Sequence, residues 1–198
     1  VFNTAMTGYQ EVLTDPSYKG QIITMTCPHI GNYGVTPEDI ESRKIWAEGF
    51  VVMEASRLAS NWRGKQLIQD YLAKAKVVAI EGLDTRALTR HLRETGSQQG
   101  VIMHGDVNRD SAVKKARQAP GILGRDLVAE VTSDRSYEWE AGSGEWAPDA
   151  VPARARSGRR KPWRVVAYDF GVKENILRRL VNVGVMSQSC RPQRRPPK

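Results

Sequence analysis

Apolar residues recur along residues 1–127 at spacings that alternate between those of strands and those of helices. Short β-branched runs predict strands at QIITMT (21–26), EGFVVME (48–54), VVAIEG (77–82) and VIMHGD (101–106). Helical spacing predicts helices over KQLIQDYLAKAK (65–76), LDTRALTRHLRETG (83–96) and DSAVKKARQAP (110–120). Thr36, followed by Pro37 and acidic residues, predicts a further helix start. This alternation is typical of an α/β domain.

The pattern changes after residue 125. Residues 126–162 are rich in Gly, Pro, Ser and Arg and predict a linker, with a short hairpin around YEWEAGSGEW (137–146). WRVVAYDFG (163–171) then predicts a buried strand and ENILRRLVNVG (174–184) a helix, which is the first unit of a parallel α/β domain. The remaining MSQSCRPQRRPPK has no apolar periodicity, so residues 186–198 predict an irregular basic tail.

Composition places the chain among globular proteins, with 40% hydrophobic and 26% charged residues in a length of 198. The net charge of +8 raises the question of nucleic-acid binding. The segments 151–161 and 187–198 contain basic residues and no acidic ones, and the rest of the chain is close to neutral. Nucleic-acid-binding domains usually carry a basic patch on the fold itself. We therefore interpret these segments as solvated spacers and expect no nucleic-acid partner.

The sequence contains few cysteines and histidines, which are the residues that most often act in catalysis or bind metals. Cys27 and His29 lie two apart at a strand end, where a thiolate–imidazole pair is conceivable, but no orienting carboxylate is nearby. A packing role for the Cys27 thiol is favoured. His91, His104 and Cys190 stand in unrelated segments, so we expect no metal site. Two cysteines are too few for a disulfide framework, which favours a reducing, cytoplasmic compartment. No apolar run is long enough to span a membrane.

The segment FNTAMTGYQEVLTDPSYKGQ (2–21) is unusually polar for a plain core. It places small polar side chains next to the turn formers Gly8 and Pro16. The sequence Asp15-Pro16-Ser17 is typical of a turn, and polar groups on such a turn bind either the backbone or a ligand. The residues alone leave both roles open.

The same residues resemble a known family. FNTAMTGYQEVLTDPSYKGQIITMTCPHIGNYGV is similar to the N-terminal domain of the small subunit of glutamine-dependent carbamoyl-phosphate synthetase. The resemblance continues through LASNWR (58–63), DTRALTRHLRETG (84–96), PGILGRDL (120–127) and VVAYDFGVKENILRRL (165–180). It implies a swivelling β/β/α domain over residues 1–125 that lacks its first strands, and a linker over 126–162. It also implies a truncated start of a class I glutamine amidotransferase domain over 163–185, and a non-family tail over 186–198.

The resemblance also implies a function. Small subunits of this family hydrolyse glutamine and pass ammonia to a large subunit, which uses bicarbonate, ATP and Mg²⁺ to make carbamoyl phosphate for arginine and pyrimidine biosynthesis. The implied partners are thus the large subunit and L-glutamine, with no cofactor in this chain. The family's catalytic Cys, His and Glu follow a GxCxGxQ-like motif that this sequence does not contain. We therefore expect no catalytic residue here and no activity from the chain alone.

One ligand contact of the family falls inside this chain. The serine of the TDPSY turn, here Ser17, is implied to bind glutamine, whereas Lys173 is implied to have a packing role. Two other classes of function remain open. The chain could be a non-catalytic module that docks on a large partner, or a basic nucleic-acid adaptor acting through residues 151–161 and the tail.

Overall fold

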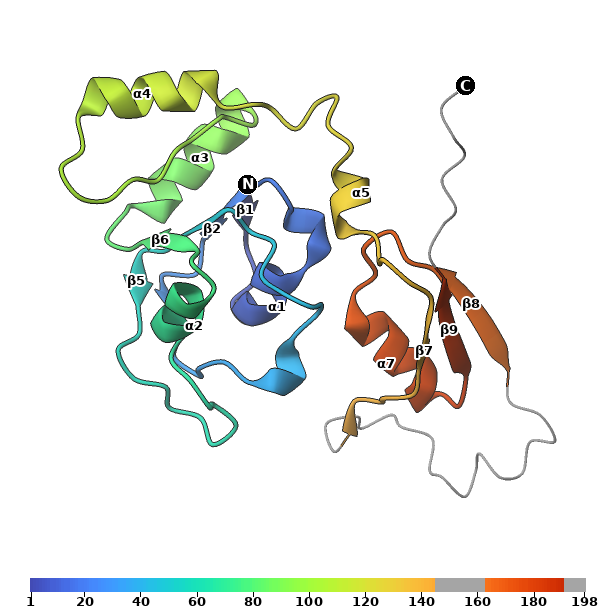
Figure 1. Cartoon of the computed structure of the whole chain (residues 1–198). Coiled ribbons are helices and arrows are strands. Elements are labelled where there is room, and N and C mark those ends of the chain that lie inside the picture. The colour runs from blue at the N-terminus through green and yellow to red at the C-terminus, as the bar shows by residue number, and fades with distance from the viewer. Residues whose placement is uncertain (145–162, 191–198) are drawn as a thin grey trace. The chain divides into compact units, whose positions relative to one another are not determined.

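The computed structural model of the chain describes residues 1–144 and 163–190. The chain divides into two compact units, Val1–Arg125 and Asp126–Lys198 (Figure 1). Both units mix helices with parallel strands, which confirms the predicted α/β class. The finer boundaries at residues 162 and 185 stay predictions.

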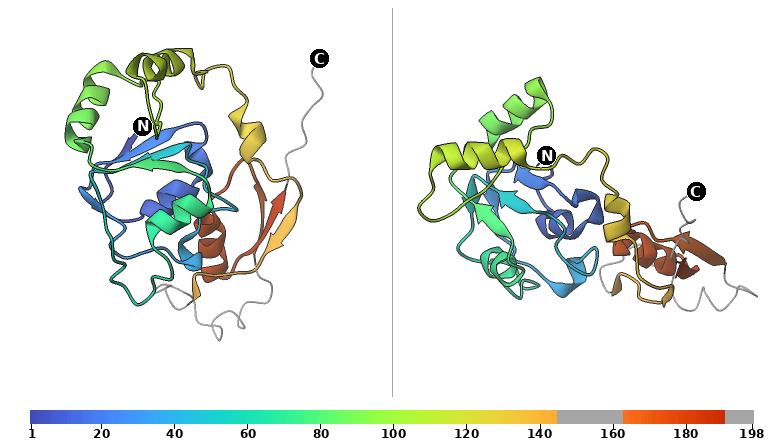
Figure 2. Two further views of the ribbon diagram at one scale, coloured as in Figure 1. Left: turned by 60° about the vertical axis from the view of Figure 1, so that its left-hand side comes forward. Right: turned by 45° about the horizontal axis from the view of Figure 1, so that its top comes forward.

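Unit 1 is built on a parallel four-stranded sheet in the order β1 (Phe2–Asn3), β2 (Ile22–Met25), β4 (Gly49–Val51) and β6 (Val78–Ile80). Ile23 lies opposite Phe50, and Phe50 opposite Ala79, so these residues share one face of the sheet. The helices α1 (Tyr9–Thr14) and α2 (Ile68–Lys74) cover that face (Figure 2). Their buried residues, including Leu13 and Leu72, complete the core of the unit.

Shorter elements surround this sheet. The strands β3 (His29–Ile30) and β5 (Glu54–Ala55) form a parallel pair, and η1 (Pro16–Tyr18) and η2 (Pro37–Asp39) are 3₁₀ turns. The helices α3 (Thr85–Thr95) and α4 (Arg109–Gln118) lie on the other side of the sheet from α1 and α2 (Figure 2). As predicted, the Asp84 carboxylate caps α3 by accepting the Ala87 N–H at 2.8 Å, and the helix ends at Gly96, whose φ is 81°.

Two predictions for unit 1 are wrong. The helix predicted from Thr36 is only the turn η2, because the following residues bind the end of α1 instead of their own backbone. The N–H of Glu41 donates to the Thr14 hydroxyl at 3.0 Å, and the Ser42 hydroxyl donates to the Thr14 carbonyl at 2.5 Å. The strand predicted at residues 101–106 is a loop, since Ile102 packs directly against Gly49 of the sheet rather than pairing along an edge.

Unit 2 contains β7 (Tyr137–Trp139), β8 (Arg164–Tyr168) and β9 (Met186–Cys190), with α5 (Leu127–Val131) and α7 (Glu174–Asn182). The sheet order is β7-β9-β8, with β9 parallel to β8 and antiparallel to β7. The predicted strand–helix unit is therefore extended to a β8–α7–β9 unit of parallel strands joined by a helix.

Three expectations for unit 2 are corrected by this sheet. Residues 186–190 were predicted as irregular tail, but they form its central strand, in which Ser187 and Ser189 are buried. The strand β7 pairs with β9 and not within a local hairpin; residues 140–144 form no second strand, and residues 145–146 lie outside the described residues. The predicted buried strand at 163–171 is largely exposed, with Val166 at 57% and Tyr168 at 67% on one face of β8, which lies at an edge of the sheet. The basic segments 151–161 and 191–198 also lie outside the described residues.

Candidate functional site

The TDPSY turn follows α1 without an intervening loop. Its first residue, Thr14, is fully buried and is the last residue of the helix. The Thr14 hydroxyl donates to the Gln10 carbonyl at 2.9 Å and accepts the N–H of Glu41 at 3.0 Å. Because both the hydroxyl and the carbonyl of Thr14 are bound, the turn starts from a fixed point in the fold.

Asp15 and Pro16 determine the shape of the turn. The Asp15 carboxylate accepts the N–H of Ser17 at 2.8 Å, and the N–H of Tyr18 donates to the Asp15 carbonyl at 3.1 Å. Pro16 occupies the first position of η1, where its fixed φ favours the turn. The cap of this turn is therefore the Asp15 side chain and not the Ser17 side chain.

Ser17 is exposed and uses only its backbone in this arrangement. Its N–H donates to Asp15, and its carbonyl accepts the Gln21 side-chain amide at 3.0 Å. Within residues 1–144 and 163–190, the Ser17 hydroxyl makes no hydrogen bond. The structure thus leaves a polar group on a rigid turn available to an external ligand.

The start of α1 is capped from a distant part of the chain. The Tyr33 hydroxyl accepts the N–H groups of Gly8 at 2.6 Å and of Tyr9 at 3.3 Å. The two tyrosine rings stack with centroids 4.2 Å apart. Burial raises the pKa of Tyr33 to about 12, so its hydroxyl stays protonated at neutral pH and can also donate. Tyr33 therefore holds the helix that leads into the Ser17 turn.

Other polar residues of segment 2–21 have structural roles. The Tyr9 hydroxyl donates to the Gly34 carbonyl at 2.6 Å. The Gln10 side chain donates to the Thr36 carbonyl at 2.7 Å and accepts the Thr36 N–H at 2.8 Å. These side chains are buried, and their hydrogen bonds join α1 to residues 33–36. Because both side chains are almost completely buried, they are not exposed to a ligand.

The candidate thiol–imidazole pair does not form. The Cys27 thiol donates weakly to the His29 backbone carbonyl, with a sulfur–oxygen distance of 3.7 Å. The His29 imidazole instead lies 3.5 Å from a carboxylate oxygen of Glu54, measured from its Nδ1. Cys27 is partly buried against the core, as its packing role requires.

The other candidate residues are not brought together. His91 and His104 are exposed on α3 and on a loop, and Cys190 is a free thiol at the end of β9. Among residues 1–144 and 163–190, no group of three or more His, Cys, Asp or Glu side chains could hold a metal ion. No helix within these same ranges has the length and apolar character needed to cross a bilayer.

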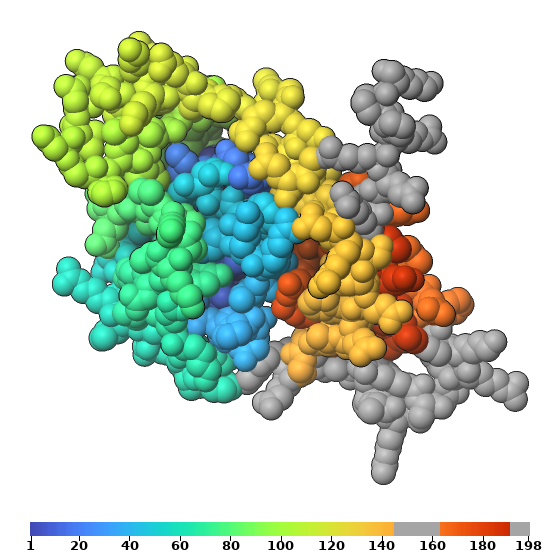
Figure 3. Space-filling model, in the orientation of Figure 1, coloured from blue at the N-terminus to red at the C-terminus, as the bar shows by residue number. Residues whose placement is uncertain are grey.

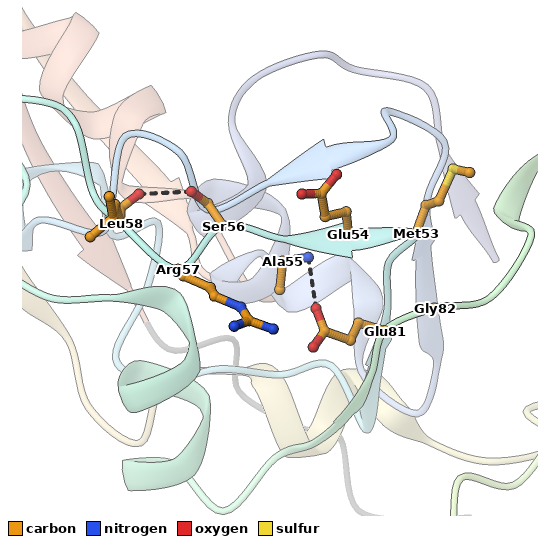
Figure 4. Close-up of a pocket in the computed structure, with 8 residues that line it drawn as sticks. All are labelled: Met53, Glu54, Ala55, Ser56, Arg57, Leu58, Glu81 and Gly82. Atoms are coloured by element: carbon orange, nitrogen blue, oxygen red, sulfur yellow. Dashed lines mark hydrogen bonds between the residues drawn. The ribbon is translucent and has the colours of Figure 1, made fainter.

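A surface pocket of about 550 Å³ lies where β5 and β6 end (Figure 4). Arg57 and Glu81 turn toward each other across Ala55 in this view, and a Glu81 carboxylate oxygen accepts the Ala55 N–H at 3.0 Å. The Ser56 hydroxyl donates to the Leu58 carbonyl at 2.7 Å. The serine is therefore used by its own loop, and the pocket contains no nucleophile beside a base.

Sequence reasoning found the Ser17 turn but not the groups that support it. The Asp15 cap has a local signal, because Asp two residues before a bound N–H is typical of such turns. The role of Tyr33 has no local signal in the sequence, since the tyrosine is 25 residues from Gly8. Its hydroxyl reaches α1 only through the fold.

Comparisons with known proteins show which family the chain is similar to. The sequence model of the carbamoyl-phosphate synthase small chain, CPSase domain, matches residues 1–102. The carbamoyl phosphate synthase small chain of Syntrophotalea carbinolica is 52% identical over 184 residues, which are 93% of this chain and 48% of the relative. That of Pseudomonas syringae pv. tomato is 54% identical over 185 residues, with the same two shares. The chain spans about half the length of the curated relatives it matches.

Proposed function

This chain belongs to the family of carbamoyl-phosphate synthase small chains, and we propose that it acts in glutamine-dependent synthesis of carbamoyl phosphate. In this proposal Ser17 binds the substrate glutamine from the TDPSY turn. The overall amidotransferase step converts glutamine and water to glutamate and ammonia, and a large partner chain uses the ammonia. ATP and Mg²⁺ would bind that partner, and the activity would be cytoplasmic.

The observation that carries this proposal is the free hydroxyl of Ser17 on a turn that Asp15 caps. A serine hydroxyl both donates and accepts hydrogen bonds, so it suits the charged ammonium and carboxylate groups of an amino acid. The bonds that hold Thr14 fix the start of the turn, which reduces the entropy lost when a ligand binds.

We propose that residues outside this chain cleave the side-chain amide bond of glutamine. Base-activated catalysis by cysteine needs an imidazole within hydrogen-bond reach of the thiol. The Cys27 thiol bonds a backbone carbonyl, while the His29 imidazole faces Glu54. This chain would then contribute to binding glutamine and to assembly with the large chain, both without a covalent step.

Ser17→Ala tests the proposal in a small chain of the relatives' full length that carries residues 1–185 of this sequence, assembled with the large chain. We expect the KM for glutamine to rise roughly tenfold or more, because a polar ligand loses one partner at a cost of about 1–3 kcal/mol. The value of kcat should change little, since the hydroxyl binds the ground state and the transition state alike.

Two controls separate substrate binding from a structural role. Ser111→Ala removes an exposed hydroxyl on α4 and should leave the KM for glutamine unchanged. Activity with free ammonia bypasses glutamine and should be equal in both variants and the parent. A lowered melting temperature with an unchanged KM for glutamine in Ser17→Ala would show that the serine only supports its turn.

A further inference from the structure

Three arginines form one row on α3. Arg86, Arg90 and Arg93 are spaced i, i+4 and i+7, so they project from one side of the helix, and all three are exposed. Away from this row the helix carries buried Thr85 and half-buried Leu88, which face the rest of unit 1. We call Arg86, Arg90 and Arg93 the arginine stripe.

The stripe forms no ion pair within the described part of the chain. None of the three guanidinium groups forms an ion pair or hydrogen bond with residues 1–144 or 163–190. Glu94 is a neighbour on the same helix, four residues after Arg90, yet it forms no ion pair with the stripe. Three adjacent positive charges therefore stand in solvent.

This arrangement adds little to the stability of the helix that carries it. Like charges at i, i+3 and i, i+4 repel, each pair by about 0.2–0.5 kcal/mol. Arg86 lies in the first turn of α3, where the helix dipole disfavours a cation, whereas Arg93 lies in the last turn, where the dipole favours one. Since the exposed side chains add nothing to the core, intramolecular stability does not account for the stripe.

We propose that the arginine stripe docks against an acidic protein surface, which under the proposed function belongs to the large partner chain. Guanidinium groups bind carboxylates through two parallel hydrogen bonds, so they suit this role better than lysines. The stripe spans about 10 Å, given a rise of 1.5 Å per residue, and this length matches carboxylates spaced along a facing helix.

A protein surface fits the stripe better than a nucleic acid. Asp84 caps the start of α3 with its carboxylate, and Glu94 lies near the end of the helix, four residues after Arg90. These acidic groups would repel the continuous phosphate backbone of a duplex, whereas a protein surface can present its own basic groups opposite them. The stripe thus selects a partner with mixed charge and a local excess of carboxylates.

The test measures binding of the chain to the immobilised large chain of the same source. The triple variant Arg86→Glu/Arg90→Glu/Arg93→Glu should bind at least about 50-fold more weakly at low salt, because it places like charges across the interface. Binding of the parent chain should weaken steeply toward about 0.3 M salt, where exposed charges are screened. If the triple variant fails to fold, Arg90→Gln replaces it, with an expected loss of roughly fivefold.

A matched control lies on α4, which is the yellow-green segment at the surface of unit 1 in Figure 3. Lys114→Glu/Lys115→Glu/Arg117→Glu makes the same change in net charge at exposed positions that are spread around their helix. We expect it to weaken binding less than about threefold.

Each other outcome overturns the inference in a recognisable way. Equal losses in the two triple variants would show a general charge effect, and no loss in the stripe variant would show that α3 is not at the interface. Binding of the parent chain to a short DNA duplex as tightly as to the large chain would identify a nucleic-acid partner. A parent chain that does not bind the large chain at all would contradict the proposed partner as well, whereas tight binding unaffected by the stripe would leave it intact.

Discussion

The two units bury different kinds of side chain. The core of unit 1 is a continuous apolar cluster in which Leu13, Ile23 and Phe50 are almost completely buried. The buried residues of unit 2 include Asp169 and Asn182, which are polar, beside a single fully buried leucine, Leu177, within its described residues. Unit 1 is therefore stabilised mainly by removing apolar surface from water, and unit 2 depends far more on hydrogen bonds.

This difference shows how the same α/β architecture can be specified by different interactions. In unit 1 the Phe50 ring packs between the sheet and its helices, so its volume matters. In unit 2 the Asp169 carboxylate accepts the N–H groups of Gly171 and Val172 at 2.9 Å each, and the Tyr137 hydroxyl at 2.9 Å. One carboxylate thus joins β7 to the loop that follows β8.

The largest effect should come from Phe50→Ala in the apolar core. Loss of a buried phenyl ring costs about 3–5 kcal/mol, because the cavity refills only in part. We expect the melting temperature of unit 1 to fall by more than 10 °C, measured by calorimetry. Phe170→Ala is the matched control, since Phe170 is 56% exposed in unit 2 and should cost less than about 0.5 kcal/mol. Similar losses in the two variants would break the comparison.

A smaller effect, confined to unit 2, is expected for Asp169→Ala. The variant leaves two N–H groups and one hydroxyl without their acceptor, at a cost of about 2–3 kcal/mol. Hydrogen exchange measured by mass spectrometry should become faster in residues 164–190 and stay unchanged in residues 22–80. Asp106→Ala removes an exposed carboxylate and should change neither region. Faster exchange in both regions would show that the two units unfold together.

The smallest effect is expected at Glu11, because this carboxyl is a partly buried polar group in unit 1. Burial raises the pKa of the Glu11 carboxyl, with Asp39 and Glu41 adding to the shift and Arg63 opposing it. Among the described residues, Oε2 of Glu11 is buried without a hydrogen-bond partner. We expect Glu11→Gln to stabilise the protein by about 0.5 kcal/mol at pH 7, a value reduced for solvent screening of a half-buried group.

The pH dependence gives the sign of this effect. A raised folded-state pKa means that the ionised carboxylate destabilises the fold at neutral pH, and this penalty disappears as the pH falls through the folded pKa toward the unfolded value near 4.3. The advantage of Glu11→Gln should therefore be present at pH 7 and absent below about pH 4, as measured by thermal melts. Glu94→Gln, on exposed α3, is the matched control and should leave the melting temperature at pH 7 unchanged.

Local signals made part of this fold predictable. Asp84 and Gly96 mark the two ends of α3, and both could be predicted because caps act within a few residues of a helix end. The turn at Asp15 and Pro16 is determined by similarly local interactions. The helix predicted from Thr36 fails because Thr14, far away in the sequence, binds the backbone of Glu41. A contact across 27 residues leaves no periodic trace in the sequence.

The candidate site also combines a feature that local sequence predicts with a feature that depends on tertiary structure. Ser17 could be proposed from the sequence because its turn is local and the family resemblance singles it out. The group that holds α1 in place, the Tyr33 hydroxyl, depends on tertiary structure. The strand β9 was missed because Ser187 and Ser189 are small and polar, and backbone pairing with β7 and β8 needs no apolar side chain.

The position of β9 also affects the order in which the sheet of unit 2 can assemble during synthesis. This strand lies between β7 and β8 but is the last of the three to leave the ribosome. The sheet of unit 1, in contrast, is complete once residue 80 has emerged. At translation speeds of about 5–20 residues per second, β7 waits roughly 3–10 s for its partner. β8 waits about 1–4 s after its own emergence, so both strands lack the strand that joins them while unit 1 has already had time to fold.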